Sequence, residues 1–331
     1  MQISELRREV RDRLLAFAWD QWTQMGVSGI PQRTERWAAD PEALLLFTLE
    51  VARADARLFD EVLDWLALNE RLVSVQRLRN LCRDDTDRAL AEAALAWVAQ
   101  SKDPRRSSLR RRGGDSSHAV QLFRKLKADA RRADRTFRAY GWLKPPTERS
   151  GKSQPPNLLA PINIAFRLRQ ILGIGGRAEV ARFLLTVHAP SVTAQVVTGS
   201  AAYAKRNVHE ALTALHSAGV IDAVAVGNEQ RYRIDRERWA TLLGVTERDL
   251  PSERDWPQLF HALRVLVRWL EDEQHDKLSD YMLASEARTV ADEIVPQLRY
   301  AGVRVPLDRR PGAEYWQDFV ELARAAVAAL E

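Results

Sequence analysis

Five polar residues between positions 205 and 213 have types and a spacing suited to binding a polyanion. They are Lys205, Arg206, Asn207, His209 and Thr213. Lysine and arginine bind phosphates, and short polar side chains hydrogen-bond to the edges of bases. The apolar residues of the same stretch recur at helical spacing and are Val208, Ala211, Leu212 and Leu215. The pattern predicts a helix with one buried face and one polar face, on which the charge of Glu210 opposes contact with phosphates.

The residues on either side of this helix predict the elements that position it. Residues 193–201 predict a supporting helix, and Gly219 stands where the second helix would end in a left-handed residue. Two alternating runs then flank the turn residues 227–230, which is typical of a β-hairpin. Arg231 and Arg233 lie two apart on the second strand and therefore point to the same face.

The stretch 176–238 resembles the winged helix-turn-helix of MarR-like and GntR-like bacterial transcription regulators. The apolar and small positions of that motif are occupied by Val197, Thr198, Ala201, Tyr203 and Val208. Two positions depart from the pattern. Ala202 stands at the turn, where Gly is commonest, and Ala204 lacks a capping hydroxyl, which leaves Ser200 as the cap of a longer helix.

The resemblance implies a central winged helix-turn-helix with a two-stranded β wing, whose second helix enters the major groove of DNA. Arg231 and Arg233 would then contact the DNA backbone or minor groove from the wing. Winged helices also serve as protein-interaction or spacer domains, and that alternative stays open.

A strongly basic block follows the first hundred residues. Residues 101–152 hold sixteen Lys or Arg against five Asp or Glu, a net charge of +11 in a chain whose total is +5. The segment 101–118 is rich in Pro, Gly and Ser, so it predicts an extended linker that carries Arg110, Arg111 and Arg112.

Residues 119–140 predict a continuous basic helix. Its cations include Arg124, Lys127 and Arg131. So many like charges repel one another unless an anion relieves them, and double-stranded DNA is the anion that we expect. A purely solvated linker and an RNA-binding accessory role are the alternatives for the block.

No group of residues typical of an enzyme occurs in the sequence. The P-loop, HExxH, GxSxG and CxxC patterns are missing, and the six histidines are scattered. The single cysteine, Cys82, excludes an internal disulfide framework and a cysteine-based zinc site. We therefore expect no enzymatic activity, no cofactor, and no catalytic or metal-binding residue.

Composition and apolar periodicity predict a mainly α, multi-domain helical protein. Four units are expected: an N-terminal helical domain at 1–100, the basic linker and helix at 101–157, the winged helix-turn-helix at 158–245, and a C-terminal helical bundle at 255–331.

The N-terminal domain contains a possible second helix-turn-helix. Its last helix would span 74–82 and offer Gln76, Arg77, Arg79 and Asn80 to solvent. A helical interaction domain without DNA contact is the alternative.

The C-terminal bundle carries aromatic residues that we expect to anchor association with a second copy or another protein. They are Trp256, Phe260, Trp269, Trp316 and Phe319. The alternative is that these helices only cover one another and the back of the winged domain.

No apolar run approaches the length of a membrane span, and the N-terminus does not resemble a signal peptide, so we expect a cytoplasmic protein without membrane contact. The sequence predicts a transcription regulator, a repressor, that binds a specific site in double-stranded DNA as a homodimer. The alternative is an antitoxin-like or scaffold protein. It would be similar to AbiE-type antitoxins, which bind a nucleotidyltransferase toxin and repress their own promoter.

Overall fold

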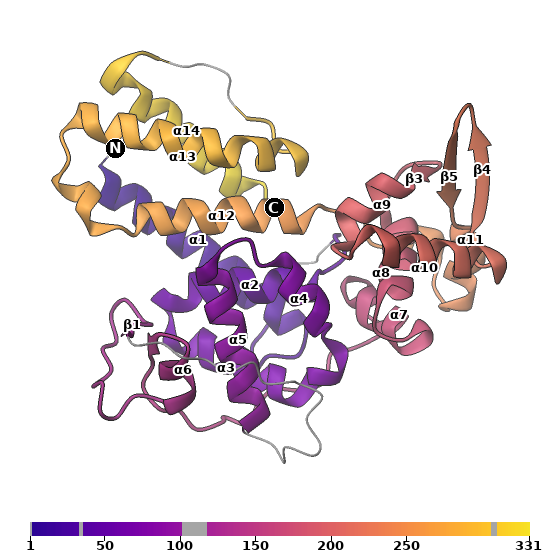
Figure 1. Ribbon diagram of the computed structural model, residues 1–331, viewed down its shortest axis with the longest axis horizontal. Helices are drawn as coiled ribbons and strands as arrows, with labels where there is room; N and C mark the ends of the chain where they lie inside the picture. Colours follow the sequence, from indigo (N-terminus) through magenta and orange to yellow (C-terminus); the bar gives the residue numbers. More distant parts are fainter. Residues whose placement is uncertain (1, 33–35, 101–117, 306–309) are drawn as a thin grey trace.

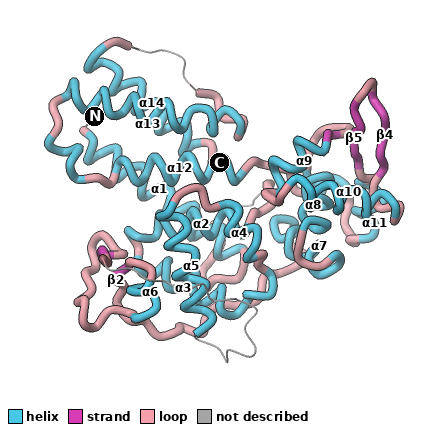
Figure 2. Tube along the Cα trace, in the orientation of Figure 1, coloured by secondary structure: helices cyan, strands magenta, loops and turns pink. Residues whose placement is uncertain are grey.

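The computed structural model describes residues 2–32, 36–100, 118–305 and 310–331, and this part of the chain is mainly helical with two small sheets (Figures 1 and 2). The helices of the first hundred residues are α1 (Ile3–Gln24), α2 (Pro41–Val51), α3 (Ala56–Asn69), α4 (Val75–Leu81) and α5 (Asp85–Gln100). A small lobe then contains β1 (Val120–Gln121), α6 (Arg135–Ala139) and β2 (Trp142–Leu143).

The middle of the chain contains α7 (Ile164–Leu172), α8 (Gly176–Thr186), β3 (Val192–Thr193), α9 (Ala194–Ala201), α10 (Lys205–Ser217), β4 (Asp222–Val226), β5 (Glu229–Arg233) and α11 (Arg236–Leu242). The last helices are α12 (Trp256–Leu270), α13 (Asp280–Tyr300) and α14 (Tyr315–Ala328). Short 3-10 turns connect several of these elements.

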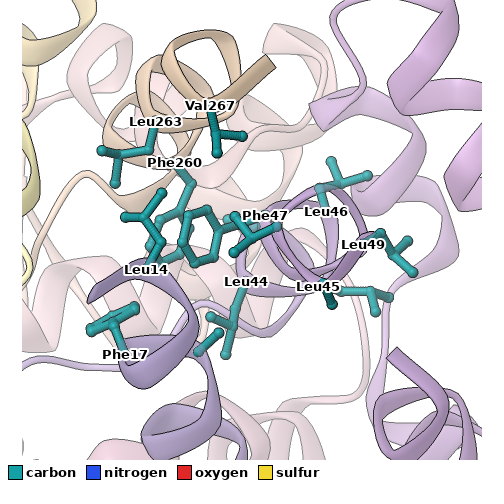
Figure 3. Packing of buried hydrophobic residues seen from close by; sticks show 14 of the residues in the cluster. Leu14, Phe17, Leu44, Leu45, Leu46, Phe47, Leu49, Phe260, Leu263 and Val267 are labelled. Carbon is teal, nitrogen blue, oxygen red and sulfur yellow. The ribbon is translucent and has the colours of Figure 1, made fainter. Parts of the chain in front are cut away.

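The main hydrophobic core is built from both ends of the chain. Helices α1, α2 and α12 bring Phe17, Phe47 and Phe260 together, and the rings of Phe47 and Phe260 stack with their centroids 4.6 Å apart (Figure 3). Every residue of α2 is buried, because α1, α4, α5 and α12 surround it. Helices α13 and α14 extend the same core, and we call helices α1–α5 and α12–α14 together the helical body.

Three of the aromatic residues that were predicted to anchor an association surface are buried in the helical body. Trp256, Phe260 and Phe319 each expose 2% or less of their surface. The prediction is therefore wrong for these three residues, since neighbouring helices of the same chain cover them. Trp269 and Trp316 are half-buried and contact the ring of Phe319.

Helices α7–α11 and a three-stranded sheet enclose a second core, on the right in Figure 1. The hairpin of β4 and β5 is present, with Gly227 in its turn at a φ of +60° that glycine adopts without strain. The hairpin belongs to a three-stranded sheet, because β3 pairs with β5 and places Val192 opposite Tyr232.

The segment 119–140 is not the continuous helix that its periodicity predicts. Only α6 is helical, and β1 pairs in parallel with β2. Phe123 and Phe137 both contact the ring of Phe59 on α3, with centroids 5.4 and 5.7 Å away. On one helix these two rings would lie about 21 Å apart, so the chain must fold back between them.

A cluster of charged side chains, most of them fully buried, lies between the two cores. Its members are Asp40, Glu42, Arg77, Arg169, Glu179, Arg182 and Glu253. The guanidinium of Arg169, on α7, lies 2.7 Å from Glu42 on α2 and 2.6 Å from Glu179 on α8. We call this group the junction cluster.

The junction cluster stays ionised although it is buried. The side chains of Glu42, Arg169 and Glu179 expose 2% or less of their surface. Burial alone would raise the pKa of the Glu179 carboxyl, but the guanidinium groups of Arg169, Arg77 and Arg182 hold its pKa well below the usual value. Each buried group of the cluster therefore stays ionised only while its oppositely charged partners remain beside it.

We expect Arg169→Met to lower the free energy of unfolding by about 3–5 kcal/mol, because the buried carboxylates of Glu42 and Glu179 each lose one of their guanidinium partners. Urea denaturation followed by tryptophan fluorescence measures this change. The matched control is Arg233→Met, which removes a solvent-exposed pair with Asp222 and should cost less than about 1 kcal/mol. Equal losses in the two variants would show that the junction cluster does not stabilise the fold.

Candidate nucleic-acid interface

The polar face of α10 is exposed to solvent. The exposed residues that were predicted to contact DNA are Lys205, Arg206, His209 and Thr213, and Asn207 is half-buried. The apolar residues of the opposite face are buried against α8 and α9. Helix α8 approaches α10 so closely that a Cβ atom on Gly176 would lie 3.5 Å from the backbone oxygen of Asn207. The second core thus holds α10 by one face and leaves the other free.

The charges on this face are weakly paired or unpaired. The Nε atom of Arg206 lies 2.8 Å from a carboxylate oxygen of Glu210, and the two side chains are 87% and 62% exposed. Such a solvated pair is weak, so a phosphate or a base edge can replace Glu210. Lys205 and His209 make no ion pair or side-chain hydrogen bond with any other described residue.

The first turn of α10 has N–H groups that no side chain caps. The N-cap residue is Ala204, and the hydroxyl of Ser200 instead donates to Glu253 at 3.0 Å. The alternative in which Ser200 caps a longer helix is therefore wrong. Uncapped N–H groups and the positive end of the helix dipole favour an anion beside Lys205.

Helix α4 of the helical body holds the turn between α9 and α10. Ala202 has a φ of +54°, a left-handed conformation that costs a residue with a Cβ atom about 1–2 kcal/mol. The side-chain amide of Asn80 donates to the carbonyl of Ala202 at 3.1 Å, and Nε of Arg77 donates to the carbonyl of Ala201 at 2.9 Å. The strained turn is thus fixed by contacts from outside its own module.

The sequence predicts that both arginines of α4 are exposed to solvent, but neither of them is exposed in the structure. Arg77 is fully buried in the junction cluster, and Arg79 lies 2.6 Å from Glu92. That prediction is wrong because both guanidinium groups bind carboxylates of the helical body. Gln76 and Asn80 are exposed.

The two arginines of the β4–β5 hairpin are less available for contact with DNA than the sequence suggests. Arg233 is exposed but lies 3.1 Å from Asp222. Arg231 is half-buried, and its Nε atom is buried without a hydrogen-bond partner among the described residues. Val224 and Val226 are exposed on the neighbouring strand. A contact between Arg233 and a phosphate would have to replace its pairing with Asp222.

The second predicted contact surface is the basic block at 101–152, of which the structure describes residues 118–152; within it we call residues 119–143 the basic lobe. Lys127 and Arg131 are exposed there. Arg124 is half-buried and its guanidinium lies 3.5 Å from Glu50 of α2, so a contact with DNA would have to replace this pairing. Three further predicted contact residues lie outside the described residues: Arg110, Arg111 and Arg112.

The basic lobe and α10 are far apart. They lie toward opposite ends of the long axis of the molecule, with α2, α4 and α5 between them (Figures 1 and 2). The two surfaces are therefore separate and do not form one continuous basic face.

The remaining ionisable and hollow features are distinct from α10. Among the described residues, no group of three or more His, Cys, Asp or Glu side chains is arranged to hold a metal ion. Burial raises the pKa of the Cys82 thiol to about 12, so little of it is thiolate at neutral pH.

A shallow hollow of about 1040 Å³ beside α11 is lined partly by Arg236 and Glu247, which pair at 3.0 Å. None of the helices that the structure describes has both the length and the apolar character to cross a bilayer.

We expect Ala202→Gly to raise the free energy of unfolding by about 0.5–1 kcal/mol, because glycine adopts the left-handed turn without strain. Urea denaturation measures the change. The matched control is Ala214→Gly, the same substitution inside α10, which should lower the free energy of unfolding by about 1 kcal/mol. A loss of stability in both variants would show that the turn is not strained.

The chain was compared with models of protein families, with curated proteins and with solved structures, and none of the three comparisons gives a match.

Proposed function

We propose that the protein is a sequence-specific DNA-binding transcription regulator that reads duplex DNA with α10 of a winged helix-turn-helix. One observation carries the proposal. The polar face of α10 over residues 205–213 is largely exposed and bears cationic and hydrogen-bonding side chains, and the first turn of the helix lacks a side-chain cap.

The order of the elements supports this proposal. A turn of three residues, 202–204, joins α9 to α10, as in helix-turn-helix motifs. The hairpin of β4 and β5 follows α10 in the position of a wing. In helix-turn-helix proteins the N-terminal residues of the second helix contact base edges in the major groove.

Each exposed residue of α10 has a chemical role in this proposal. Lys205 and the free N–H groups of the first turn bind a phosphate. Arg206 releases Glu210 and binds O6 and N7 of a guanine, and Asn207 binds an adenine. His209 and Thr213, one and two turns further along, extend the contact, while Arg231 and Arg233 approach the backbone from the wing.

A single reading helix contacts few base pairs, so we expect the protein to bind as a homodimer to a near-palindromic site. Bound across a promoter, such a dimer would act as a repressor. The symmetry of the preferred DNA sequence tests this expectation.

We expect Arg206→Ala and Asn207→Ala each to weaken binding to a specific duplex roughly 5- to 150-fold, the loss that follows from one missing base contact. Binding to random duplexes should change much less. Fluorescence anisotropy measures both affinities, with a labelled duplex from the region upstream of the gene for this protein and a random duplex of equal length.

The matched control is Arg299→Ala, which removes an exposed arginine from α13 and should leave both affinities unchanged. Thermal unfolding of the variants shows whether each one is folded. Wild-type affinity in both α10 variants would remove residues 205–213 from the interface and contradict the proposal.

A further inference from the structure

The side chains of five cations of the basic lobe make no ion pair and no hydrogen bond with any described residue. They are exposed on the loop between β1 and α6 and on the first turn of α6: Lys125, Lys127, Arg131, Arg132 and Arg135. The lobe as a whole holds seven Lys or Arg against two Asp.

The two acids of the lobe are bound to the backbone. Oδ1 of Asp129 accepts a hydrogen bond from the N–H of Arg131 at 2.8 Å. Oδ1 of Asp134 accepts from the N–H groups of Thr136 and Phe137 at 2.9 and 3.0 Å and thereby caps α6. Both carboxylates are therefore committed to local structure, and the positive charge faces solvent.

Hydrogen bonds fix the loop that carries these cations. The side-chain amide of Gln121 binds the N–H of Ala128 at 2.8 Å and its carbonyl at 3.0 Å. The guanidinium of Arg138 donates to the carbonyl of Ala130 at 3.1 Å. A loop that is already ordered loses little conformational freedom when an anion binds.

The side chains of the lobe favour the phosphates of a duplex over unpaired bases. Proteins hold single strands largely by stacking bases on exposed aromatic rings. The rings of Phe123, Phe137 and Trp142 are buried, with 7% or less of each residue exposed. Arginines, which form three of the five unpaired cations, bind two phosphate oxygens at once. Such contacts carry no information about sequence.

We propose that the basic lobe is a second, sequence-independent binding surface for duplex DNA, and that it holds a segment other than the one read by α10. Helices α2, α4 and α5 separate the two surfaces along the long axis (Figure 1). The claim that the lobe and α10 bind different segments of DNA rests on the proposed function of α10. The claim that the lobe binds duplex DNA does not rest on it.

The test measures binding to a random-sequence duplex over a range of salt concentrations. The lobe variant replaces the five unpaired cations with Gln. We expect its Kd to rise at least about tenfold near 0.1 M salt, and the slope of log K against log salt to flatten by roughly one unit per lost phosphate contact. The control variant replaces the same number of exposed cations elsewhere and should change the Kd less than about threefold through long-range charge alone: Arg8, Arg88, Lys277, Arg299 and Arg304.

Thermal unfolding first establishes that both variants are folded. Equal losses in the lobe and control variants, or an unchanged Kd in the lobe variant, would overturn the proposal. So would a lobe variant that loses affinity only for phosphatidylserine vesicles or only for an acidic peptide. The double variant Arg206→Ala/Asn207→Ala should keep its affinity for the random duplex. If the proposed function of α10 is wrong, the loss of random-duplex affinity in the lobe variant would still support the lobe as a binding surface for duplex DNA.

A capture assay tests whether the two segments are separate. A duplex with the preferred site of α10 is fixed to beads, and a labelled random duplex is added after the protein. Wild-type protein should capture the labelled duplex, whereas the lobe variant should stay on the beads and capture little. Capture at the wild-type level by the lobe variant would contradict a second segment held by the lobe.

Discussion

The orientation of α10 depends on the buried junction cluster between the two cores. Glu42 and Glu179, one from each core, share the guanidinium of Arg169 at 2.7 and 2.6 Å. Buried charges attract strongly but have lost their hydration, so they stabilise a fold only while every partner stays in place. Rotating one core against the other would leave charges buried and unpaired. We infer that the cluster permits one orientation of the two cores.

The junction cluster and its neighbours also contact the chain just before α10, the helix that we propose contacts the bases. Arg77 binds Asp40 with two nitrogens and also donates to the carbonyl of Ala201 at the end of α9. The hydroxyl of Tyr203, just before α10, lies 2.7 Å from that of Ser74, just before α4. The helical body therefore helps to position α10, in addition to α8 and α9 of its own module. A protein that holds DNA at two separate surfaces, as we propose, would need such a fixed relation between them.

Local features of the structure could be predicted from the sequence, whereas long-range ones could not. The apolar face of α10 and the turn at Gly227 depend on neighbours a few residues away, and both are present as predicted. Arg77 has the local pattern of an exposed helical arginine, and only partners distant in sequence bury it. The prediction of a continuous basic helix at 119–140 was wrong for a related reason. Its periodicity is helical, but Phe123 and Phe137 reach the same ring on α3.

Selection from a library of random duplexes measures whether α10 reads DNA sequence. The wild-type protein should enrich a near-palindromic motif whose half-sites lie one helical turn, or a multiple of it, apart. The Asn207→Ala variant should lose the preference for one base pair in each half-site. A library that keeps its random composition while the wild-type protein retains DNA would show binding without sequence specificity, and would contradict a reading role for α10.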